Sequence, residues 1–480
     1  MNLSPGFGTT DAGLCLSCRC GENRLGQLIQ ISQKRRWAVG GRYRTETMCT
    51  LPSIEISNRF KVHFRIAGPV VSLLVLVITL FLTNTWFNYN DAIEIMGADD
   101  TVSYRALAEA WPGLPADTLP FHRAQRLAIP FALGGIASVT GCSLEAVFLG
   151  ATLLSCAVIL LLMYRIFVFL SLSIAQRLFL FALLVFNPFI FRPYLAAPFM
   201  VVDLVFVVGL SLLLWGLLTN RHTPVALGIA VAALGRQTAM AILPVIVVWF
   251  VTQKPGKPDR LKSLPFMLLI SVEAVAIYCI TGLLASEISE RNENLEHLTG
   301  LFYWFANWSP GGLPVLLEFV FRGLSSSTAT LMILGIVYWR SRKQIALPAR
   351  FWLLLLLVGS IWAQPFLAGP DITGGNTVRL CALGFVPLLT AVGVVLSHSR
   401  LLSEVNSPSL MVLTFLIIAG SFHHLTSKVG EALHYGMAGF AVVHCVLATL
   451  TGIVVFLLSQ PQPDASRTQQ ARESTRERAG

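Results

Sequence analysis

The chain has little charge: Asp, Glu, Lys and Arg make up 12% of its 480 residues, whereas apolar residues make up 55% and mean hydropathy is +0.68. Soluble globular domains carry roughly 25% charged residues, so the composition excludes a soluble fold. Apolar runs long enough to cross a bilayer, or pairs of shorter runs, recur from residue 66 to residue 458. The sequence therefore predicts an all-α, polytopic transmembrane protein with about 11 to 13 helical segments, including short or broken helices.

The cysteines and histidines are not spaced as a disulfide framework or a zinc site requires. The five cysteines beyond residue 100 lie mostly in apolar stretches, where Cys behaves as a small hydrophobe. The N-terminal cluster of Cys15, Cys18 and Cys20 lacks a fourth ligand nearby, because no histidine precedes His63. Neither disulfides nor a structural zinc site is therefore predicted.

The formal net charge of +10 comes from basic residues in short connecting segments, which argues against nucleic-acid binding. With the N-terminus in the cytoplasm, 26 of the 35 Lys and Arg residues face the cytoplasm, as the positive-inside rule prefers. The same orientation places residues 88–125, which carry six carboxylates, outside. We therefore expect a multi-pass protein of the bacterial inner (plasma) membrane with both termini in the cytoplasm.

These patterns divide the chain into three segments. Residues 1–62 have little apolar periodicity and are predicted to be a disordered basic cytoplasmic tail. We expect residues 63–459 to form the polytopic membrane domain with external loop 88–125, and residues 460–480 to form a second disordered cytoplasmic tail. Within the membrane domain, residues 127–141 are too short to span, and residues 225–234 and 239–249 predict two short limbs that meet near Arg236. Broken helices of this kind are tolerated where they line a cavity.

The adjacent carboxylates Asp99 and Asp100 follow the first long apolar segment, residues 66–87. Because adjacent carboxylates repel, at least one gains from a cation, a basic partner or a shared proton. The pair therefore suits a divalent metal ion such as Mg²⁺ or Mn²⁺, or general-base catalysis on an acceptor hydroxyl. The alternative is a solvated acidic loop that enforces topology.

Residues 101–110 are predicted to form an amphipathic helix at the membrane surface. Val102, Leu107 and Ala110 are expected to face lipid, while Arg105 and Glu109 form an i, i+4 ion pair. Tyr104 in this segment is a candidate substrate contact.

Two charged residues fall inside apolar segments. Asp203 lies just inside a predicted helix, and a carboxylate there costs ~2.5 to 3.5 kcal/mol, so it faces a cavity or a partner. Arg236 at the break between two limbs suits phosphate recognition through its planar fork of donors, although a structural pairing with Asp203 competes with that role. Arg192 at an external helix end is a second candidate partner for Asp203.

Two further basic stretches are candidate ligand contacts. His122, Arg123 and Arg126 precede the half-helix and suit an anionic headgroup, although ordinary interface anchoring fits as well. Residues 369–379 form a glycine-rich external loop in which Asn376 and Arg379 offer donors to a ligand, and a plain turn is the alternative.

The layout as a whole resembles the GT-C superfamily, the polyprenyl-phosphate-sugar-dependent glycosyltransferases that include protein mannosyltransferase and lipid A aminoarabinose transferase relatives. The similar features, over residues 66–255, are an N-in first helix, an external loop opening with an acidic pair, a proline-and-arginine strip before a short helix, a second acidic residue, and a broken helix carrying a cation. The chain lacks a soluble external C-terminal domain and the Trp-Trp-Asp signature of oligosaccharyl transferases, so glycosylation at a protein sequon is not expected.

The resemblance implies a sugar transfer from a polyprenyl phosphate donor to a lipid-linked glycan or surface polymer on the extracytoplasmic face. Its partners would be membrane lipid, that donor, and a glycan or glycolipid acceptor. The implied catalytic or metal-binding carboxylates are Asp99 and Asp100, with Asp203 at the second acidic position. The implied donor phosphate-binding residues are Arg123, Arg126, Arg192, Arg236 and Arg379.

Two other classes of function remain open at the level of sequence. A transporter or lipid flippase also uses broken helices with buried Asp and Arg, and a non-catalytic subunit of glycopolymer assembly needs no active site. The chain has no evident repeat between its halves, and its polar residues gather toward one face of the membrane. Both observations favour an enzyme.

Overall fold

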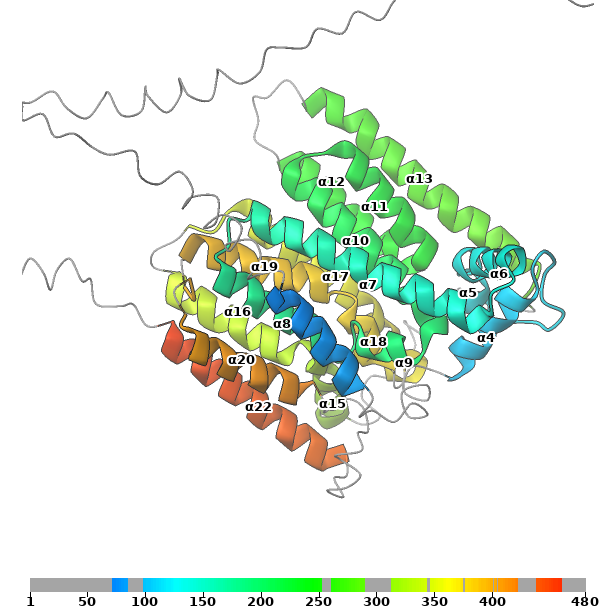
Figure 1. Ribbon diagram of the computed structural model, residues 1–480. Helices are drawn as coiled ribbons and strands as arrows, with labels where there is room; N and C mark the ends of the chain where they lie inside the picture. Colours follow the sequence, from blue (N-terminus) through cyan, green and yellow to red (C-terminus); the bar gives the residue numbers. More distant parts are fainter. Residues whose placement is uncertain are drawn as a thin grey trace, which may run out of the picture. The chain divides into compact units, whose positions relative to one another are not determined.

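The computed structural model describes residues 71–84, 98–252, 260–289, 312–342, 346–373, 376–399, 401–403, 405–421 and 437–459. All of them belong to the second of two units into which the chain divides, residues 63–480. The predicted tails 1–62 and 460–480 lie outside the described residues. Within the described ranges the chain forms helices and no strand (Figure 1), which confirms the predicted all-α fold.

The helices of the first half follow one another with short connections. After a helix over Val71–Asn84 they are α4 (Ala98–Glu109), α5 (Phe121–Ala124), α6 (Ala128–Thr140), α7 (Leu144–Phe169), α8 (Ile174–Val185), α9 (Arg192–Ala196), the 3₁₀ helix η1 (Pro198–Met200), α10 (Val201–Thr219), α11 (His222–Gly235), η2 (Gln237–Ile242), α12 (Leu243–Thr252) and α13 (Arg260–Ser286).

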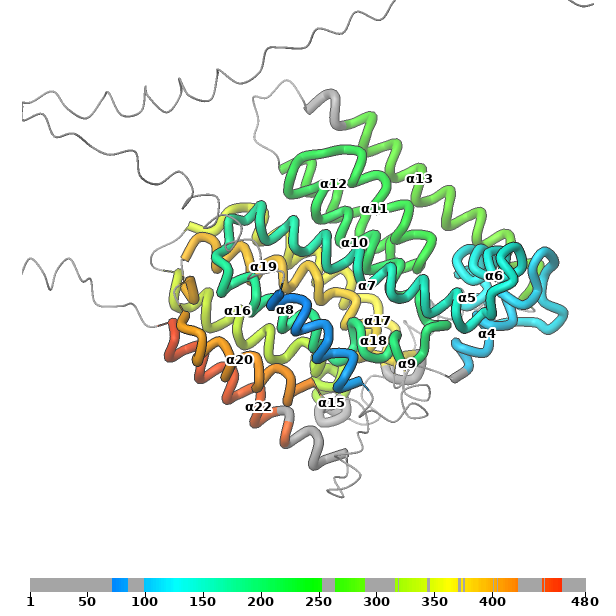
Figure 2. Tube along the Cα trace, in the orientation of Figure 1, coloured from blue at the N-terminus to red at the C-terminus, as the bar shows by residue number. Residues whose placement is uncertain are grey.

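The second half adds helices that pack on the first. They are α15 (Gly312–Leu324), η3 (Ser325–Ser327), α16 (Thr328–Ser341), α17 (Ala349–Thr373), α18 (Thr377–Ala382), α19 (Phe385–Ser399), α20 (Ser407–Gly420) and α22 (Met437–Leu458). Helices α16, α20 and α22 lie side by side, as do α10, α11, α12 and α13 (Figure 2).

Five segments are long and apolar enough to cross a membrane, which fits the predicted membrane protein. They are Leu144–Phe169, Pro198–Thr219, Leu264–Ser286, Phe319–Ser341 and Ala349–Gly369. The predicted half-helix is confirmed as α6, which has 13 residues, and the predicted break is confirmed at Arg236, whose backbone is extended between α11 and η2. A helix of 13 residues is about 20 Å long and therefore cannot span the hydrocarbon by itself.

Helices α7 and α10 run in the same direction. The hydroxyl of Thr152 donates to the carbonyl of Pro198 near their starts, and the rings of Phe169 and Trp215 meet edge to face near their ends, with centroids 6.1 Å apart. Because α11 returns antiparallel to α10 after a two-residue turn, the start of α10 and the end of α11 lie at one end of the helices. Asp203 and Arg236 therefore share that end.

Other connections gather at the opposite end of the helices. His222 at the start of α11 stacks on Phe266 near the start of α13, with ring centroids 4.3 Å apart, and Phe250 at the end of α12 lies beside both. Tyr338 of α16 stacks on Phe351 of α17, where those two helices are joined. The arginines in or next to the connections at this end are Arg165, Arg177, Arg221, Arg340, Arg342 and Arg350.

Helices α10 and α11 pack backbone to backbone because glycines face one another. A Cβ added to Gly209 would lie 2.3 Å from the amide nitrogen of Ala232, and one added to Gly235 would lie 2.6 Å from that of Phe206. Small residues permit this approach in membranes, where close packing drives association between helices. Gly235 is next to Arg236, so the contact sets the distance between Arg236 and α10.

Helix α4 is packed differently from the surface helix that the sequence predicts. Its Arg105–Glu109 ion pair is present at 2.7 Å and Val102 is exposed, as expected, but Leu107 is buried and does not face lipid. Residues 100, 103, 104, 107 and 108 are all buried, which is the i, i+3, i+4 pattern of a helix face packed on protein. Ala108 lies against Gly134 of α6: a Cβ added to Gly134 would lie 2.1 Å from the carbonyl oxygen of Ala108. Asp100 and Tyr104 are therefore turned into the protein.

Residues 369–379 are more helical than the predicted loop. Helix α17 breaks at Gly369, whose φ of 79° lies in the left-handed region, and helical structure resumes up to Thr373. Helix α18 then begins at Thr377 and carries Arg379 on its buried side. The break turns the chain so that α18 can place Arg379 beside α4 and α10.

Candidate functional site

A cavity of about 620 Å³ lies at the end of the helices that holds Asp203 and Arg236. Its wall combines residues of α4, α5, the α11–η2 break, α13, α17 and α18. The charged and polar lining residues are Asp100, His122, Arg123, Arg126, Arg236, Gln237, Thr238, Tyr278, Gln364, Thr373, Asn376 and Arg379. This volume is within the range of ligand-binding pockets, which hold about 300 to 1,000 Å³.

Asp100 is an anchor for two arginines at the cavity wall. Arg379 donates to its Oδ2 at 2.8 Å, and Nε of Arg123 lies 2.7 Å from its Oδ1. Burial by itself would raise the pKa of Asp100, but the positive charges of Arg379, Arg126 and Arg123 outweigh burial and hold the pKa below its ordinary value. Asp100 is therefore ionised at neutral pH.

Asp203 holds a second part of the same cluster and is fully buried at the start of α10. It pairs with Arg236, accepts a hydrogen bond from the hydroxyl of Tyr194 at 3.2 Å, and lies 3.5 Å from Nε of Arg379. The structural pairing of Asp203 with Arg236 is thus present, and Arg236 also lines the cavity. Arg379 connects the two carboxylates Asp100 and Asp203.

Arg126 joins helix α4 to the α11–η2 break. Its Nη1 donates to the hydroxyl of Tyr104 at 2.7 Å, and its Nε donates to Oε1 of Gln237 at 3.2 Å. The amide of Gln237 donates in turn to Oε1 of Gln125 at 2.9 Å. Burial raises the pKa of Tyr104, so its phenol stays neutral. Arg126 is therefore held by neutral partners and keeps its positive charge.

Asp99 differs sharply from its neighbour. Its side chain is 81% exposed, and its only ion pair among the described residues is a long contact of 3.5 Å with Arg123. The described part of the chain contains no group of three or more His, Cys, Asp or Glu that could hold a metal ion. Both oxygens of Asp100 already face arginines, and a hard cation needs several oxygen ligands, so this donor set fits Mg²⁺ or Mn²⁺ poorly.

Arg192 is the predicted phosphate ligand that the structure does not bring to the cavity. It is fully buried, donates to Oγ of Ser421 at 3.0 Å, and lies 5.5 Å from the ring centroid of Phe186. It pairs with neither Asp203 nor Asp100 among the described contacts. A long side chain at a helix end can turn toward either neighbour, and here the α9 turn directs it toward α20.

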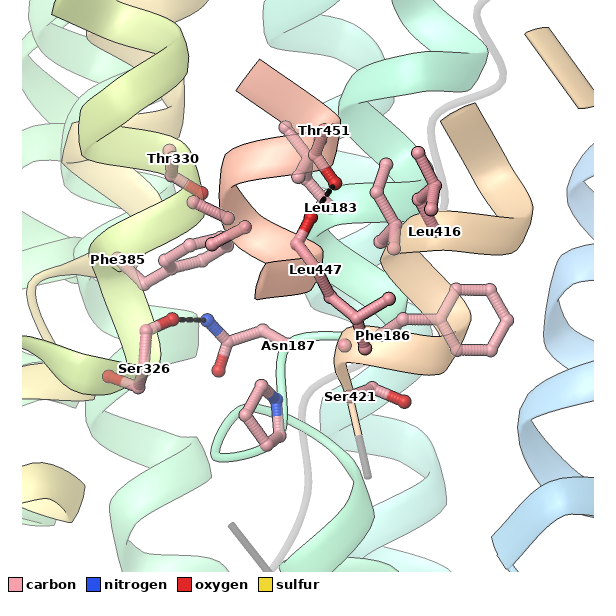
Figure 3. Close-up of a pocket in the computed structure, with 15 residues that line it drawn as sticks. Leu183, Phe186, Asn187, Ser326, Thr330, Phe385, Leu416, Ser421, Leu447 and Thr451 are labelled. Carbon is pink, nitrogen blue, oxygen red and sulfur yellow. Dashed lines mark hydrogen bonds between the residues drawn. The ribbon is translucent and has the colours of Figure 1, made fainter. Parts of the chain in front are cut away.

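A second, smaller cavity of about 40 Å³ lies between α8, α16, α20 and α22 (Figure 3). Its apolar wall includes Leu183, Phe186, Phe385, Leu416 and Leu447, and the amide of Asn187 donates to the carbonyl of Ser326 at 2.9 Å. The volume is enough for one or two waters but not for a sugar or a phosphate. Of the two cavities, only the larger has the volume to hold such a ligand.

The sequence alone nominated every charged residue that lines the cavity, but it missed several of the neutral polar ones. Asp100, Arg123, Arg126, Arg236, Arg379 and Asn376 all line the cavity, and Tyr104 contacts it through Arg126. Gln237 and Gln125, which hydrogen-bond to each other beside Arg126, and Tyr194, which donates to Asp203, were not predicted as site residues. Gln237 follows Arg236 directly in the helix break, so its position was a usable signal, whereas nothing local in the sequence connects Tyr194 to Asp203.

Comparisons with known proteins add no identification. No protein-family model, no curated protein and no solved structure matches this chain.

Proposed function

We propose that this protein is an integral membrane glycosyltransferase of GT-C type that transfers a sugar from a polyprenyl phosphate donor to a lipid-linked glycan or surface polymer on the extracytoplasmic face. One observation carries the proposal: four arginines, Arg123, Arg126, Arg236 and Arg379, line one cavity together with the carboxylate of Asp100. Guanidinium groups bind phosphate oxygens through paired donors, and the cavity lies where the helices would end at the membrane surface.

The distribution of basic residues supports the proposed sidedness. Arg221, Arg340 and Arg350 lie at the end of the helices opposite the cavity, in or beside short connections. Such connections remain in the cytoplasm, since positive charge near helix ends is retained there. The cavity then opens to the extracytoplasmic face, where polymers of the cell envelope are assembled.

The proposed reaction uses the two carboxylates of α4 differently. The acceptor hydroxyl attacks the anomeric carbon of the donor sugar, the bond from that carbon to the phosphate oxygen breaks, and the bonding electrons remain on the phosphate. Asp99 is the proposed base for the acceptor proton: it contacts the cavity-lining Arg123 at 3.5 Å and is otherwise exposed, whereas Asp100 is held by two arginines and is a weak base. Asp100 positions Arg123 and Arg379, which stabilise the charge that develops on the phosphate.

The test is transfer by purified protein in detergent or liposomes. Short-chain prenyl phosphate sugars are incubated with the protein and a membrane lipid extract, and release of prenyl phosphate is measured by mass spectrometry. We expect release with wild-type protein, loss with Asp99→Asn plus Asp100→Asn, and unchanged release with Arg105→Gln, whose side chain is outside the cavity.

Two outcomes would contradict the proposal. Full release by the double Asn variant would remove both carboxylates from the reaction. Movement of the intact donor across a liposome bilayer, without release of prenyl phosphate, would instead indicate a lipid flippase.

A further inference from the structure

Three neutral polar side chains line the larger cavity and make no hydrogen bond with any described residue. They are Thr238 of η2, Gln364 of α17 and Asn376, which directly precedes α18. The hydroxyl of Thr373 in the same wall differs, because it donates to the carbonyl of Gly369 at 2.7 Å. The cavity therefore offers amide and hydroxyl groups whose hydrogen-bonding capacity the described chain leaves unused.

Gln364 lies within a segment that is apolar enough to cross a membrane, Ala349–Gly369. It shares one face of α17 with Ile361, Pro365 and Ala368, and all four line the cavity with the i, i+3, i+4, i+7 spacing of a helix face. A polar side chain within a membrane span is costly and ordinarily faces a cavity or a partner. Gln364 has the cavity and no described partner, which makes it a candidate ligand contact.

The neutral groups adjoin the arginines of the same wall. Thr238 is 9% exposed and follows Arg236 by two residues, and Nε of Arg236 is buried without a hydrogen-bond partner among the described residues. Asn376 precedes Arg379 by three residues and its backbone is already helical, so the two lie on the same side of that turn. Helix α17, which carries Gln364, packs on both η2 and α18.

The two kinds of group suit different parts of one ligand. A guanidinium group donates in a planar fork and binds phosphate oxygens. Amide and hydroxyl groups of a side chain both donate and accept, and so does each hydroxyl of a sugar. A phosphate that carries a hydroxyl-rich substituent would therefore find partners for both parts in this cavity.

We propose that Thr238, Gln364 and Asn376 form a subsite for the sugar that is attached to the donor phosphate, and that Gln364 determines specificity for its hydroxyls. This inference rests on the proposed function, because it assigns the sugar end of the donor. The amide of Gln364 can donate to one ring hydroxyl and accept from a neighbouring one. Gln364 and Asn376 lie beyond residue 255, outside the part of the chain that resembles GT-C enzymes.

Replacing the amide has a predictable effect on affinity. A sugar hydroxyl that enters the cavity gives up hydrogen bonds to water, and the amide restores them. With Leu at position 364 the hydroxyls would face an apolar side chain and stay unpaired, which weakens binding by about tenfold. A ligand without the sugar would lose nothing.

The test compares probes of equal charge with and without a sugar. The reference is farnesyl methyl phosphate, and the sugar probes are the farnesyl phosphate esters of glucose, mannose and N-acetylglucosamine, each with one negative charge. Binding to full-length protein is measured by microscale thermophoresis in phosphatidylcholine nanodiscs, which avoid the sugar headgroups of common detergents. We expect at least one sugar ester to bind wild-type protein about tenfold more tightly than the methyl ester.

Variants on two elements locate this gain. Gln364→Leu removes the amide and should abolish most of the gain, while the affinity for the methyl ester stays unchanged and thereby shows that the protein is folded. Thr238→Val keeps the shape of its side chain and should remove a smaller part, and it tests the subsite independently if Gln364→Leu fails to fold. Ser360→Ala is the control: its hydroxyl donates to the carbonyl of Leu357 at 2.9 Å outside the cavity, so both affinities should stay as in wild type.

The outcomes separate this inference from the proposed function. If no sugar ester binds wild-type protein more tightly than the methyl ester, or if both variants keep the full gain, the inference is overturned and the transferase proposal stands. Binding of no probe by folded protein overturns both. Farnesyl phosphoglycerol tests the source of the hydroxyls: we expect it to bind like the methyl ester, and a gain equal to that of the sugars would indicate a phospholipid headgroup site instead.

Discussion

The Asp203–Arg236 pair offers the sharpest test of how the cluster is held together. Asp203 is fully buried and Arg236 is almost fully buried. Asp203 also contacts Tyr194 and Arg379. Asp203→Asn keeps the shape of the side chain but removes its charge, leaving two buried arginines with one less counter-charge. Breaking a buried pair from one side costs about 3 to 5 kcal/mol, because the remaining charge is uncompensated.

The assay is a double-substitution cycle with Asp203→Asn, Arg236→Gln and both together. The midpoint of thermal unfolding in detergent is followed by tryptophan fluorescence. We expect each single variant to unfold several degrees below wild type, and the double variant to recover part of the loss, since an amide pair replaces the ion pair. We expect the recovery to be incomplete, because Arg379 still lacks the negative charge of Asp203, which lies 3.5 Å from its Nε in the wild type.

Ser211→Ala is the matched control. Ser211 is buried on the same helix, and its hydroxyl donates, within the described chain, to the carbonyl of Val207 one turn earlier, so its loss should cost about 1 kcal/mol or less. The reasoning is refuted if Asp203→Asn is as stable as Ser211→Ala, or if the double variant is no more stable than the worse single variant.

Three further predictions follow from the same geometry. Gly235→Ala should separate α10 from α11 and weaken donor binding, because its Cβ would lie 2.8 Å from the carbonyl oxygen of Val202. The control Gly335→Ala in α16 places its Cβ where no atom lies within 4 Å, so it should change neither thermal unfolding nor donor binding. Folding lowers the pKa of Asp100, so the ionised carboxylate contributes its full stability above the unfolded pKa of about 4 and loses it as the pH falls toward the lower folded pKa. The difference in melting temperature between wild type and Asp100→Asn should therefore persist from pH 7 to pH 5 and narrow below about pH 4. A difference that already narrows at pH 6 would contradict this prediction. In a cysteine-free background, Ala116→Cys should react with an impermeant thiol reagent on intact cells and Thr223→Cys should not; the reverse pattern would invert the proposed sidedness.

Composition and apolar run length by themselves determined the class of fold. An all-α membrane protein follows from chemistry that needs no tertiary contact, because backbone groups in lipid must be satisfied within each helix. The short α6 and the break at Arg236 were also predictable, since both depend on run length and on residues adjacent in the chain. The candidate arginines could be named because cations are rare in apolar segments and each one stands out.

Only the tertiary structure decided which of those residues meet. Asp99 and Asp100 are equivalent in sequence, yet α4 packs on α6 through Ala108 and Gly134 and thereby buries Asp100 while leaving Asp99 exposed. Arg379 reaches Asp100 across 279 residues because α17 breaks at Gly369, and Arg192 turns away toward Ser421. Helix rotation and the direction of a long side chain depend on packing partners far along the chain, and for that reason local pattern could nominate the residues but could not assemble the site.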